Sequence, residues 1–309
     1  MNKFIKAGIA GLFLTLTATL ASCGGSSTSS TDTAAVTADV YPVTVGDLTL
    51  EAQPTSIISL SPTATEMLYA IGAGDQVVAV DEYSNYPAEA VALGTKLSGF
   101  EPNIEAISSY SPDLVIVSYD PGSLVEQLST LNIPVFIAGA AMSLENVYEQ
   151  IEQLGVLTGH SQAAIEVSRN LQAGIEEAVA SVQFSEPPLS YYYELDNTYY
   201  SVTSNTFIGQ IFNLFGMRNI ADNVEAGNDY PQLSAEVIVS SDPDFIFLAD
   251  TKCCAQDATT VAARDGWGGL KAVTANQVVE LDDDISSRWG PRVLDLITAI
   301  RDAVVAANS

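Results

Sequence analysis

The sequence has little positive charge and almost no histidine. It contains 11 Lys+Arg against 38 Asp+Glu, which gives a formal net charge of −27. A field of this sign repels phosphate backbones, so nucleic acid is a poor partner. The single histidine, His160, cannot form a zinc site of spaced histidines. A Walker loop and a Gly-x-Ser-x-Gly elbow are also missing, and these absences argue against two large classes of enzyme.

The apolar run at the N-terminus is short. Ala7–Leu20 has fewer than the roughly 20 residues that cross a membrane, and it follows Lys3 and Lys6. This is the layout of a secretory signal peptide, which we assign to residues 1–22. The run ends in "LASC", which resembles the lipobox of bacterial lipoproteins. We therefore predict an exported chain that is lipid-anchored through Cys23 to the outer face of the cell membrane, periplasmic or extracellular. An ordinary signal peptide with a chance cysteine would also export the chain.

Cysteine is scarce as well. Apart from Cys23, the chain has only the adjacent pair Cys253 and Cys254, which cannot join distant segments. A disulfide framework is therefore excluded, and the fold depends on its core. Three interpretations of the pair stay open: a vicinal disulfide, which an oxidising compartment favours, two thiols that contact a metal or ligand, or inert packing. Thiol ligation of a free metal would require further Cys or His nearby.

The sequence alternates between short strands and helices. The stretch "IISLSPTATEMLYAIGAGDQVVAV", residues 57–80, indicates a buried strand, a turn, a helix begun by a capping box at Thr63–Glu66, and a second strand. Its turn, "SLSPT", has no glycine, so its backbone cannot approach a pyrophosphate as closely as a Gly-rich loop would. The segment is therefore an α/β unit that does not bind a nucleotide.

An internal repeat divides the chain into two halves. The segment "IEAISSYSPDLVIVS" (104–118) matches "AEVIVSSDPDFIFLA" (235–249) at an offset of 131 residues, including the pairs Pro112-Asp113 and Pro243-Asp244. Each copy predicts a short helix, a Pro-Asp turn and an apolar strand. We expect two similar α/β lobes facing a cleft, joined by one long backbone helix. The predicted parts are a signal peptide (1–22), a Ser/Thr-rich linker (23–40), an N-terminal lobe (41–160), the backbone helix (161–186) and a C-terminal lobe (187–309).

Several segments, taken in their order along the chain, resemble the substrate-binding proteins of ABC importers for cobalamin, ferric siderophores and haem, the class with a single helical backbone. They are "IISLSPTATEMLYAIGAGDQVVAVDEYSNYP", "PNIEAISSYSPDLVIVS", "NIPVFI", "FIGQIFNLFGMRNIAD", "DYPQLSAEVIVSSDPDFIFLA" and "SSRWGPRVLDLI". The resemblance covers nearly the whole mature chain. It implies a monomer that captures a metal chelate and delivers it to a membrane permease and its ATPase.

The resemblance also implies one surface glutamate on each lobe that docks onto basic residues of the permease. The internal repeat nominates Glu105 and Glu236, which occupy equivalent positions in its two copies. Ion pairs at such a rim supply mainly orientation and association rate. The alternative is that both are ordinary polar residues on solvent faces of their helices.

Ligand contacts are expected beyond the carboxyl ends of the predicted strands, where α/β proteins bind their ligands. Tyrosine is unusually frequent there, and "EYSNYP" is close to the pattern of cobalamin binders in this family. Aromatic walls with few polar tips suit a large, flat metal chelate. The predicted ligand-binding residues are Tyr83, Tyr86, Ser118, Tyr119, Glu194, Tyr199, Tyr200, Tyr230, Arg288 and Trp289.

The small number of cations among the expected cleft residues limits the choice of ligand. The cleft candidates include only Arg288 and Lys252 as cations, whereas many anionic siderophores are held by several arginines. This favours a corrinoid first and a hydroxamate siderophore next, over a catecholate. We expect no cofactor and no resident metal, because the acidic run Asp282–Asp284 lacks the spacing and glycine of an EF-hand. The competing classes are a binding protein that serves a sensor, and an unusual secreted hydrolase that uses Glu194 and Asp196.

Overall fold

The computed structural model describes residues 39–308. The predicted signal peptide, the lipidation site Cys23 and nearly all of the linker lie outside the described residues. The described chain opens with a small hairpin. Its strands β1 (Val43–Val45) and β2 (Leu48–Leu50) pair antiparallel.

The first lobe contains a four-stranded parallel sheet in the order β4-β3-β5-β6. Alternate residues of its strands enter two different cores, because successive side chains of a strand point to opposite faces. Ile57 packs with helices α1 and α5, whereas its neighbour Ile58 packs with α3 and α4. The strands are β3 (Ile57–Leu60), β4 (Val77–Val80), β5 (Leu114–Val117) and β6 (Val135–Ile137). The helices are α1 (Pro62–Ala70), α2 (Ala88–Ala92), α3 (Ile104–Ser109), α4 (Leu124–Ser129) and α5 (Leu144–Thr158).

The predicted turn after β3 begins helix α1. The Ala64 N–H donates to the Ser61 hydroxyl, and Pro62 fills the first helical turn, where a missing N–H costs nothing. The cap is therefore Ser61 and not Thr63, and the capping box expected at Thr63–Glu66 is not formed, because the Glu66 carboxylate binds arginines instead.

The second lobe repeats this topology, with its parallel sheet in the order β10-β9-β7-β8. In both sheets the first strand lies between the second and the third. The strands are β7 (Ser190–Glu194), β8 (Arg218–Asn219), β9 (Phe245–Leu248) and β10 (Val278–Glu280). The helices are α7 (Phe207–Asn213), α8 (Ala235–Ser241), α9 (Ala258–Ala262), α10 (Lys271–Thr274), α11 (Asp283–Ser287) and α12 (Val293–Ala307).

The Pro-Asp turns of the repeat perform the same task in both lobes. Asp113 accepts the N–H groups of Thr55 and Ser56 just before β3, at 2.8 and 3.1 Å. Asp244 accepts the N–H and hydroxyl of Ser190, the first residue of β7, at 2.8 and 2.7 Å. Each aspartate thus ties the strand that follows it to the first strand of its sheet, which explains why this dipeptide recurs.

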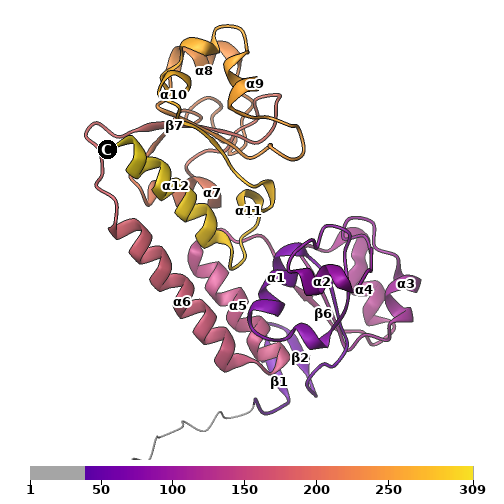
Figure 1. The fold of residues 1–309 in the computed structure, drawn as a ribbon. Helices are drawn as coiled ribbons and strands as arrows, with labels where there is room; N and C mark the ends of the chain where they lie inside the picture. The colour runs from indigo at the N-terminus through magenta and orange to yellow at the C-terminus, as the bar shows by residue number, and fades with distance from the viewer. Residues whose placement is uncertain (1–38, 309) are drawn as a thin grey trace, which may run out of the picture. The chain divides into compact units, whose positions relative to one another are not determined.

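A long helix, α6 (Ser161–Ala180), separates the two sheets in the sequence. It follows α5 after Gly159, whose φ of +77° allows the tight turn, and it packs against both α5 and α12. Figure 1 shows α5, α6 and α12 as neighbouring rods between the two sheets. The two-lobed α/β fold with one connecting helix is confirmed. Within residues 39–308 no helix has the length and apolar character that crossing a bilayer requires.

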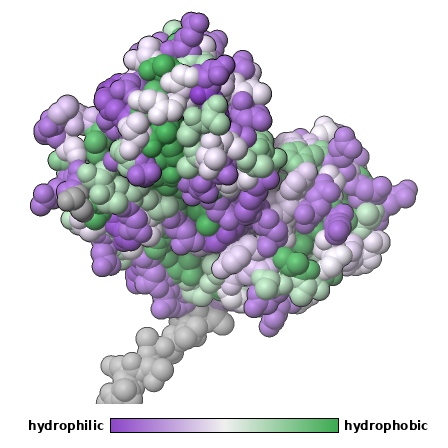
Figure 2. Space-filling view, turned by 45° about the horizontal axis from the view of Figure 1, so that its top comes forward, coloured by the Kyte–Doolittle hydropathy of each residue, from purple (hydrophilic) through white to green (hydrophobic). Residues whose placement is uncertain are grey.

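The surface agrees with the acidic composition. In Figure 2 hydrophilic residues spread over the face in view, and hydrophobic residues gather in patches between them. The large side chains left most open to water include several aromatic residues, and three of these lie together.

Candidate functional site

Three exposed aromatic rings, those of Tyr83, Phe100 and Tyr119, surround a hollow of about 350 Å³ at the carboxyl ends of β3, β4 and β5. We call it the aromatic hollow. Tyr83, Phe100 and Tyr119 expose 53%, 63% and 46% of their surface there. Folding normally buries large aromatic side chains, so a cluster of exposed rings indicates a surface that binds something. The lining residues are Leu60, Pro62, Asp81, Tyr83, Gly99, Phe100, Ser118 and Tyr119.

Phe100 joins the other two rings. It meets Tyr83 edge to face, with centroids 5.7 Å apart and an angle of 85°, and it faces Tyr119 at 6.5 Å and 48°. These geometries are favourable for aromatic pairs, so the rings support one another while leaving area open. The arrangement is a wall for a flat or bulky apolar ligand.

Local contacts of the chain place Phe100 in this wall. The Ser98 hydroxyl accepts the N–H groups of Phe100 and Glu101 at 3.3 and 3.0 Å. A Cβ atom on Gly99 would lie 2.9 Å from the carbonyl oxygen of Leu60, so only glycine lets this segment approach the end of β3.

The floor of the hollow contains one carboxyl group, that of Asp81. It is buried, and the Ser84 hydroxyl donates to it at 2.5 Å. Burial raises the pKa of Asp81, an effect that the hydrogen bond from Ser84 opposes in part. No lining residue of the hollow is cationic.

Arg288, one of the predicted ligand contacts, is occupied by protein partners. Its side chain is only 10% exposed, and its Nη1 donates to Glu66 Oε1 at 2.8 Å and to Asn85 Oδ1 at 2.9 Å. Its Nη2 donates to the Tyr83 carbonyl at 3.0 Å and to Asp284 Oδ1 at 2.7 Å. This guanidinium is therefore already paired with two carboxylates, and Arg288 is not among the residues that line the aromatic hollow.

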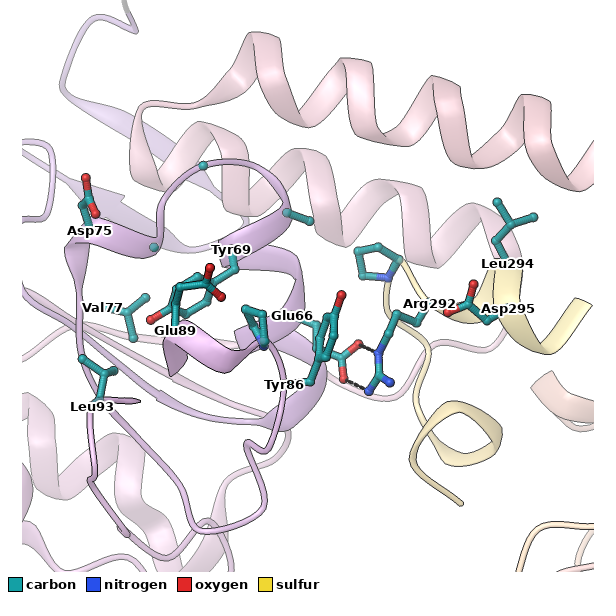
Figure 3. Close-up of a pocket in the computed structure, with 15 residues that line it drawn as sticks. Glu66, Tyr69, Asp75, Val77, Tyr86, Glu89, Leu93, Arg292, Leu294 and Asp295 are labelled. Carbon is teal, nitrogen blue, oxygen red and sulfur yellow. Dashed lines mark hydrogen bonds and ion pairs between the residues drawn. The ribbon is translucent and has the colours of Figure 1, made fainter. Parts of the chain in front are cut away.

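Tyr86 lies away from the aromatic hollow, at a second pocket of about 920 Å³ between α1, α2 and the start of α12. The Arg292 guanidinium stacks 4.3 Å from the centre of its ring. Figure 3 shows Tyr86 beside Arg292, whose guanidinium is bound by Glu66. The two tyrosines of "EYSNYP", Tyr83 and Tyr86, therefore lie at different surfaces.

Glu194 does not reach a ligand surface. It is fully buried at the end of β7, where Arg264 grips both of its oxygens at 2.7 and 2.6 Å. Tyr199 is also engaged, since its ring stacks on Trp267 with centroids 5.6 Å apart and lies 5.5 Å from the Arg264 guanidinium. An arginine 70 residues further along the chain thus holds Glu194 in the interior of the second lobe. Tyr199 is half-buried, and its contact with a ligand remains a prediction.

The remaining predicted contacts have varied surroundings. Ser118 lines the aromatic hollow, and Tyr200 and Tyr230 are exposed in the second lobe on two segments that pair through the bridge between Tyr200 and Gln232. Trp289 is half-buried and donates its indole N–H to Gln150 at 3.3 Å. Their contact with a ligand remains a prediction.

The cysteine pair follows β9 as two free thiols, with Cys253 exposed and Cys254 half-buried. A vicinal disulfide is therefore not formed in this structure. Although Cys253 is exposed, partial desolvation by the surrounding loop and hydrogen bonding to Cys254 raise its pKa, which keeps it a thiol. Lys252 neutralises Asp282 and Asp284 at 2.7 and 2.8 Å. Among the described residues, no group of three or more His, Cys, Asp or Glu side chains forms a metal site.

Glu105 and Glu236 are both exposed in the first turns of α3 and α8. Each helix begins at a side-chain cap, Asn103 in one lobe and Ser234 in the other. The two glutamates therefore occupy equivalent places in two equivalent lobes, as the repeat indicates. Their docking role remains a prediction.

Phe100 and Arg264 are the important residues that the sequence interpretation missed. A signal for Phe100 exists, because it precedes the helix of the first repeat copy as Tyr230 precedes the helix of the second. Arg264 offers no such signal, because it lies in the loop that follows α9, outside any motif.

Two lobes of equal topology, one connecting helix and an open aromatic wall at a sheet edge are the architecture of a bilobal solute-binding protein. The family model described as periplasmic binding protein matches residues 57–285. The chain belongs to this family of exported binding proteins.

Individual relatives agree with this assignment. An ABC transporter substrate-binding lipoprotein of Bacillus subtilis, YvrC, is 29% identical over 313 residues, 97% of each chain. A cobalamin-binding protein of Halobacterium salinarum is 31% identical over 277 residues, 85% of this chain and 74% of that protein. The crystal structure of the periplasmic vitamin B12-binding protein BtuF of Vibrio cholerae matches with a TM-score of 0.67 and 28% identity, covering 83% of this chain and 98% of that one.

Proposed function

We propose that this protein is the solute-binding component of an ABC importer and that it captures a corrinoid such as cobalamin. The aromatic hollow carries the proposal. Three exposed rings hold an open, apolar surface at the edge of a parallel sheet, and a corrinoid offers a large flat face with apolar substituents. Two of the relatives described above are named as cobalamin- or vitamin B12-binding proteins.

Charge supports a neutral ligand. The hollow has no lining cation, and Arg288 and Arg264 are paired with carboxylates. A catecholate chelate carries several negative charges, so it would meet an acidic protein whose hollow has no cation in its lining. A hydroxamate siderophore, which carries less charge, is the second candidate. The ligand is a transported solute, and we propose no cofactor. We also propose no catalysis, because the Glu194 carboxylate that a hydrolase would use is buried in an ion pair with Arg264.

The remaining parts of the proposal concern partners and location. Tyr200 and Tyr230 would contribute the second lobe's contacts to the ligand, and Glu105 and Glu236 would meet the permease. Cys23 would attach the chain to the outer face of the cell membrane, in agreement with the lipoprotein name of the B. subtilis relative. Loss of membrane association in a Cys23→Ala variant, followed by fractionation and acyl labelling, tests the anchor.

Titration calorimetry on the chain with Cys23→Ala tests the ligand. We expect cyanocobalamin to bind in the micromolar range or tighter, and Tyr83→Ala to weaken binding at least about tenfold because it removes one ring of the wall. Tyr110→Ala is a matched control, because Tyr110 is exposed at the end of α3, next to the amino ends of the strands.

The same titrations with haem, a ferric hydroxamate and a ferric catecholate separate the alternatives. Binding of a ferric chelate without cyanocobalamin would replace the corrinoid by an iron cargo and keep the importer role. Tight binding of the catecholate alone would contradict the charge argument. Absence of binding to every compound would overturn the chelate proposal.

A further inference from the structure

The Arg288 guanidinium connects the second lobe to the turn that carries Tyr83. Two of its four hydrogen bonds reach this turn, at the Tyr83 carbonyl and the Asn85 side chain. A third reaches Glu66 of helix α1, and the fourth reaches Asp284, one turn earlier in α11. The Asn85 amide also donates to Asp284 Oδ2 at 3.0 Å. All four hydrogen bonds of the guanidinium therefore go to other groups of the protein.

The turn formed by residues 81–85 is fixed at three successive positions. Arg288 holds the carbonyl of Tyr83, and the Ser84 hydroxyl lies within hydrogen-bond distance of Asp81 and, at 2.9 Å, of Thr65. Asn85 is held by Arg288 and Asp284, as described above. The Tyr83 ring, in contrast, remains half exposed and touches Phe100 by its edge. Hydrogen bonds thus hold the turn at residues 81–85, while the Tyr83 ring remains accessible to solvent.

We propose that Arg288 is a positioning residue of the binding site, which holds the Tyr83 turn so that the ring is already placed for the ligand. This inference rests on the proposed function of the aromatic hollow. A ring held in place before binding loses less freedom when the ligand arrives, and the affinity rises accordingly. Because Arg288 belongs to the second lobe, the same contacts make the wall of one lobe depend on a residue of the other.

Removing Arg288 does not strand a buried charge. Glu66 keeps Arg292, whose Nε and Nη2 donate to it at 2.9 and 2.5 Å. Arg288→Gln therefore leaves the buried carboxylate paired, and we expect the variant to fold. Changing Glu66 instead would leave two arginines without their common partner, which makes it a poor test.

Hydrogen exchange of the ligand-free chain with Cys23→Ala tests the positioning directly. We expect Arg288→Gln to speed amide exchange in peptides that cover residues 81–86 by about tenfold or more, since it releases the turn. Arg301→Gln is the control, because within residues 39–308 Arg301 forms its ion pair with its neighbour Asp302, at the surface of α12 and away from the Tyr83 turn. Asn85→Ala, which removes one anchor and no charge, should show a smaller effect in the same peptides. Unchanged exchange in both Arg288→Gln and Asn85→Ala would overturn the proposal.

A double-mutant cycle on cyanocobalamin affinity tests the consequence for binding. We expect Arg288→Gln to weaken binding about tenfold in the presence of Tyr83 and to have almost no effect once Tyr83→Ala is in place, because Arg288 acts through that ring. Equal losses in both backgrounds would mean that Arg288 contacts the ligand itself.

Arg288→Lys separates geometry from charge. A lysine ammonium keeps the positive charge, but it cannot present the two-nitrogen fork that spans the four acceptors. We expect Lys to bind the ligand as weakly as Gln does, and full rescue by Lys would contradict the proposal. If the unmodified protein fails to bind cyanocobalamin, the corrinoid proposal fails, while the exchange experiment still decides whether Arg288 holds the Tyr83 turn.

Discussion

Asp250 and Glu194 lie buried together at the carboxyl ends of β9 and β7, with Arg264 as the cation facing both. Arg264 donates to both carboxyl oxygens of Glu194 and to Gln256 Oε1, and neither carboxyl oxygen of Asp250 receives a hydrogen bond from the described residues. Burial, and then the negative charge of Glu194, raise the pKa of Asp250 to about 7. An uncompensated carboxylate in such a place is costly, and a bound proton relieves the cost.

The first prediction concerns the pH dependence of stability. In the unfolded chain Asp250 releases its proton near pH 4, whereas in the folded chain it keeps the proton until about pH 7. The folded state therefore binds more protons in this window, and the free energy of unfolding falls as the pH rises through it, by up to about 4 kcal/mol.

Asp250→Asn removes this titration. Urea unfolding of both proteins at several values between pH 4 and 8 measures the difference between their stabilities, which cancels the contributions of other carboxyl groups. We expect the unmodified protein to lose stability relative to Asp250→Asn across the window. A constant difference would show that Asp250 is not protonated in the folded state.

This buried pair also shows what could be predicted from the sequence. The repeat, both sheets and the long helix follow from local patterns, since Pro-Asp turns, capping residues and apolar strands act within a few residues of one another. The fate of Glu194 depends on Arg264, 70 residues away, and that of Arg288 on Glu66, 222 residues away. A cation or carboxylate in the sequence does not reveal whether another part of the fold will neutralise it. Tyr83 and Tyr119, in contrast, line the aromatic hollow at strand ends, where the sequence places them, and their contact with a ligand stays a prediction.

The second prediction concerns the two aspartates of the repeat. Asp113→Ala and Asp244→Ala each remove hydrogen bonds to the start of a first strand, and we expect each to lower the free energy of unfolding by about 1–2 kcal/mol. The sites are in different lobes and share no partner, so the double variant should lose the sum within about 0.5 kcal/mol. Chemical denaturation measures these losses, with Asp47→Ala in the exposed hairpin turn as control. Losses no larger than that of the control would contradict the role assigned to the turns.

The third prediction separates binding from stability at Phe100. This ring is the most exposed of the three in the hollow, so Phe100→Ala should change the free energy of unfolding by no more than about 0.5 kcal/mol. It joins Tyr83 to Tyr119, and its loss should weaken cyanocobalamin binding at least about tenfold. Calorimetry and thermal unfolding give both values, and Phe184→Ala, at another exposed ring, is the control. A destabilised variant with unchanged affinity would show that Phe100 stabilises the fold and does not bind the ligand.

The last prediction concerns the glutamates that the repeat places on the two lobes. Glu105 and Glu236 are exposed in the first turns of α3 and α8, where an acidic side chain also interacts favourably with the helix dipole. Neither forms part of the aromatic hollow. Charge reversal to Lys should therefore leave cyanocobalamin affinity unchanged and weaken docking to the basic residues of a permease. Because rim ion pairs act mainly on orientation and association rate, one reversal should reduce uptake in part and both together should reduce it about tenfold or more.

Uptake of labelled cyanocobalamin by cells that depend on this protein measures the effect. Glu126→Lys is the matched control, because Glu126 is an exposed glutamate in the first turn of α4 in the same lobe as Glu105. A loss of uptake shared by the control would reflect net charge alone. Normal uptake in the double variant would remove both glutamates from the docking surface, and the equivalence of their positions would then reflect only the repeat of the fold. A loss confined to Glu105→Lys and Glu236→Lys would show that the two lobes present one docking charge each.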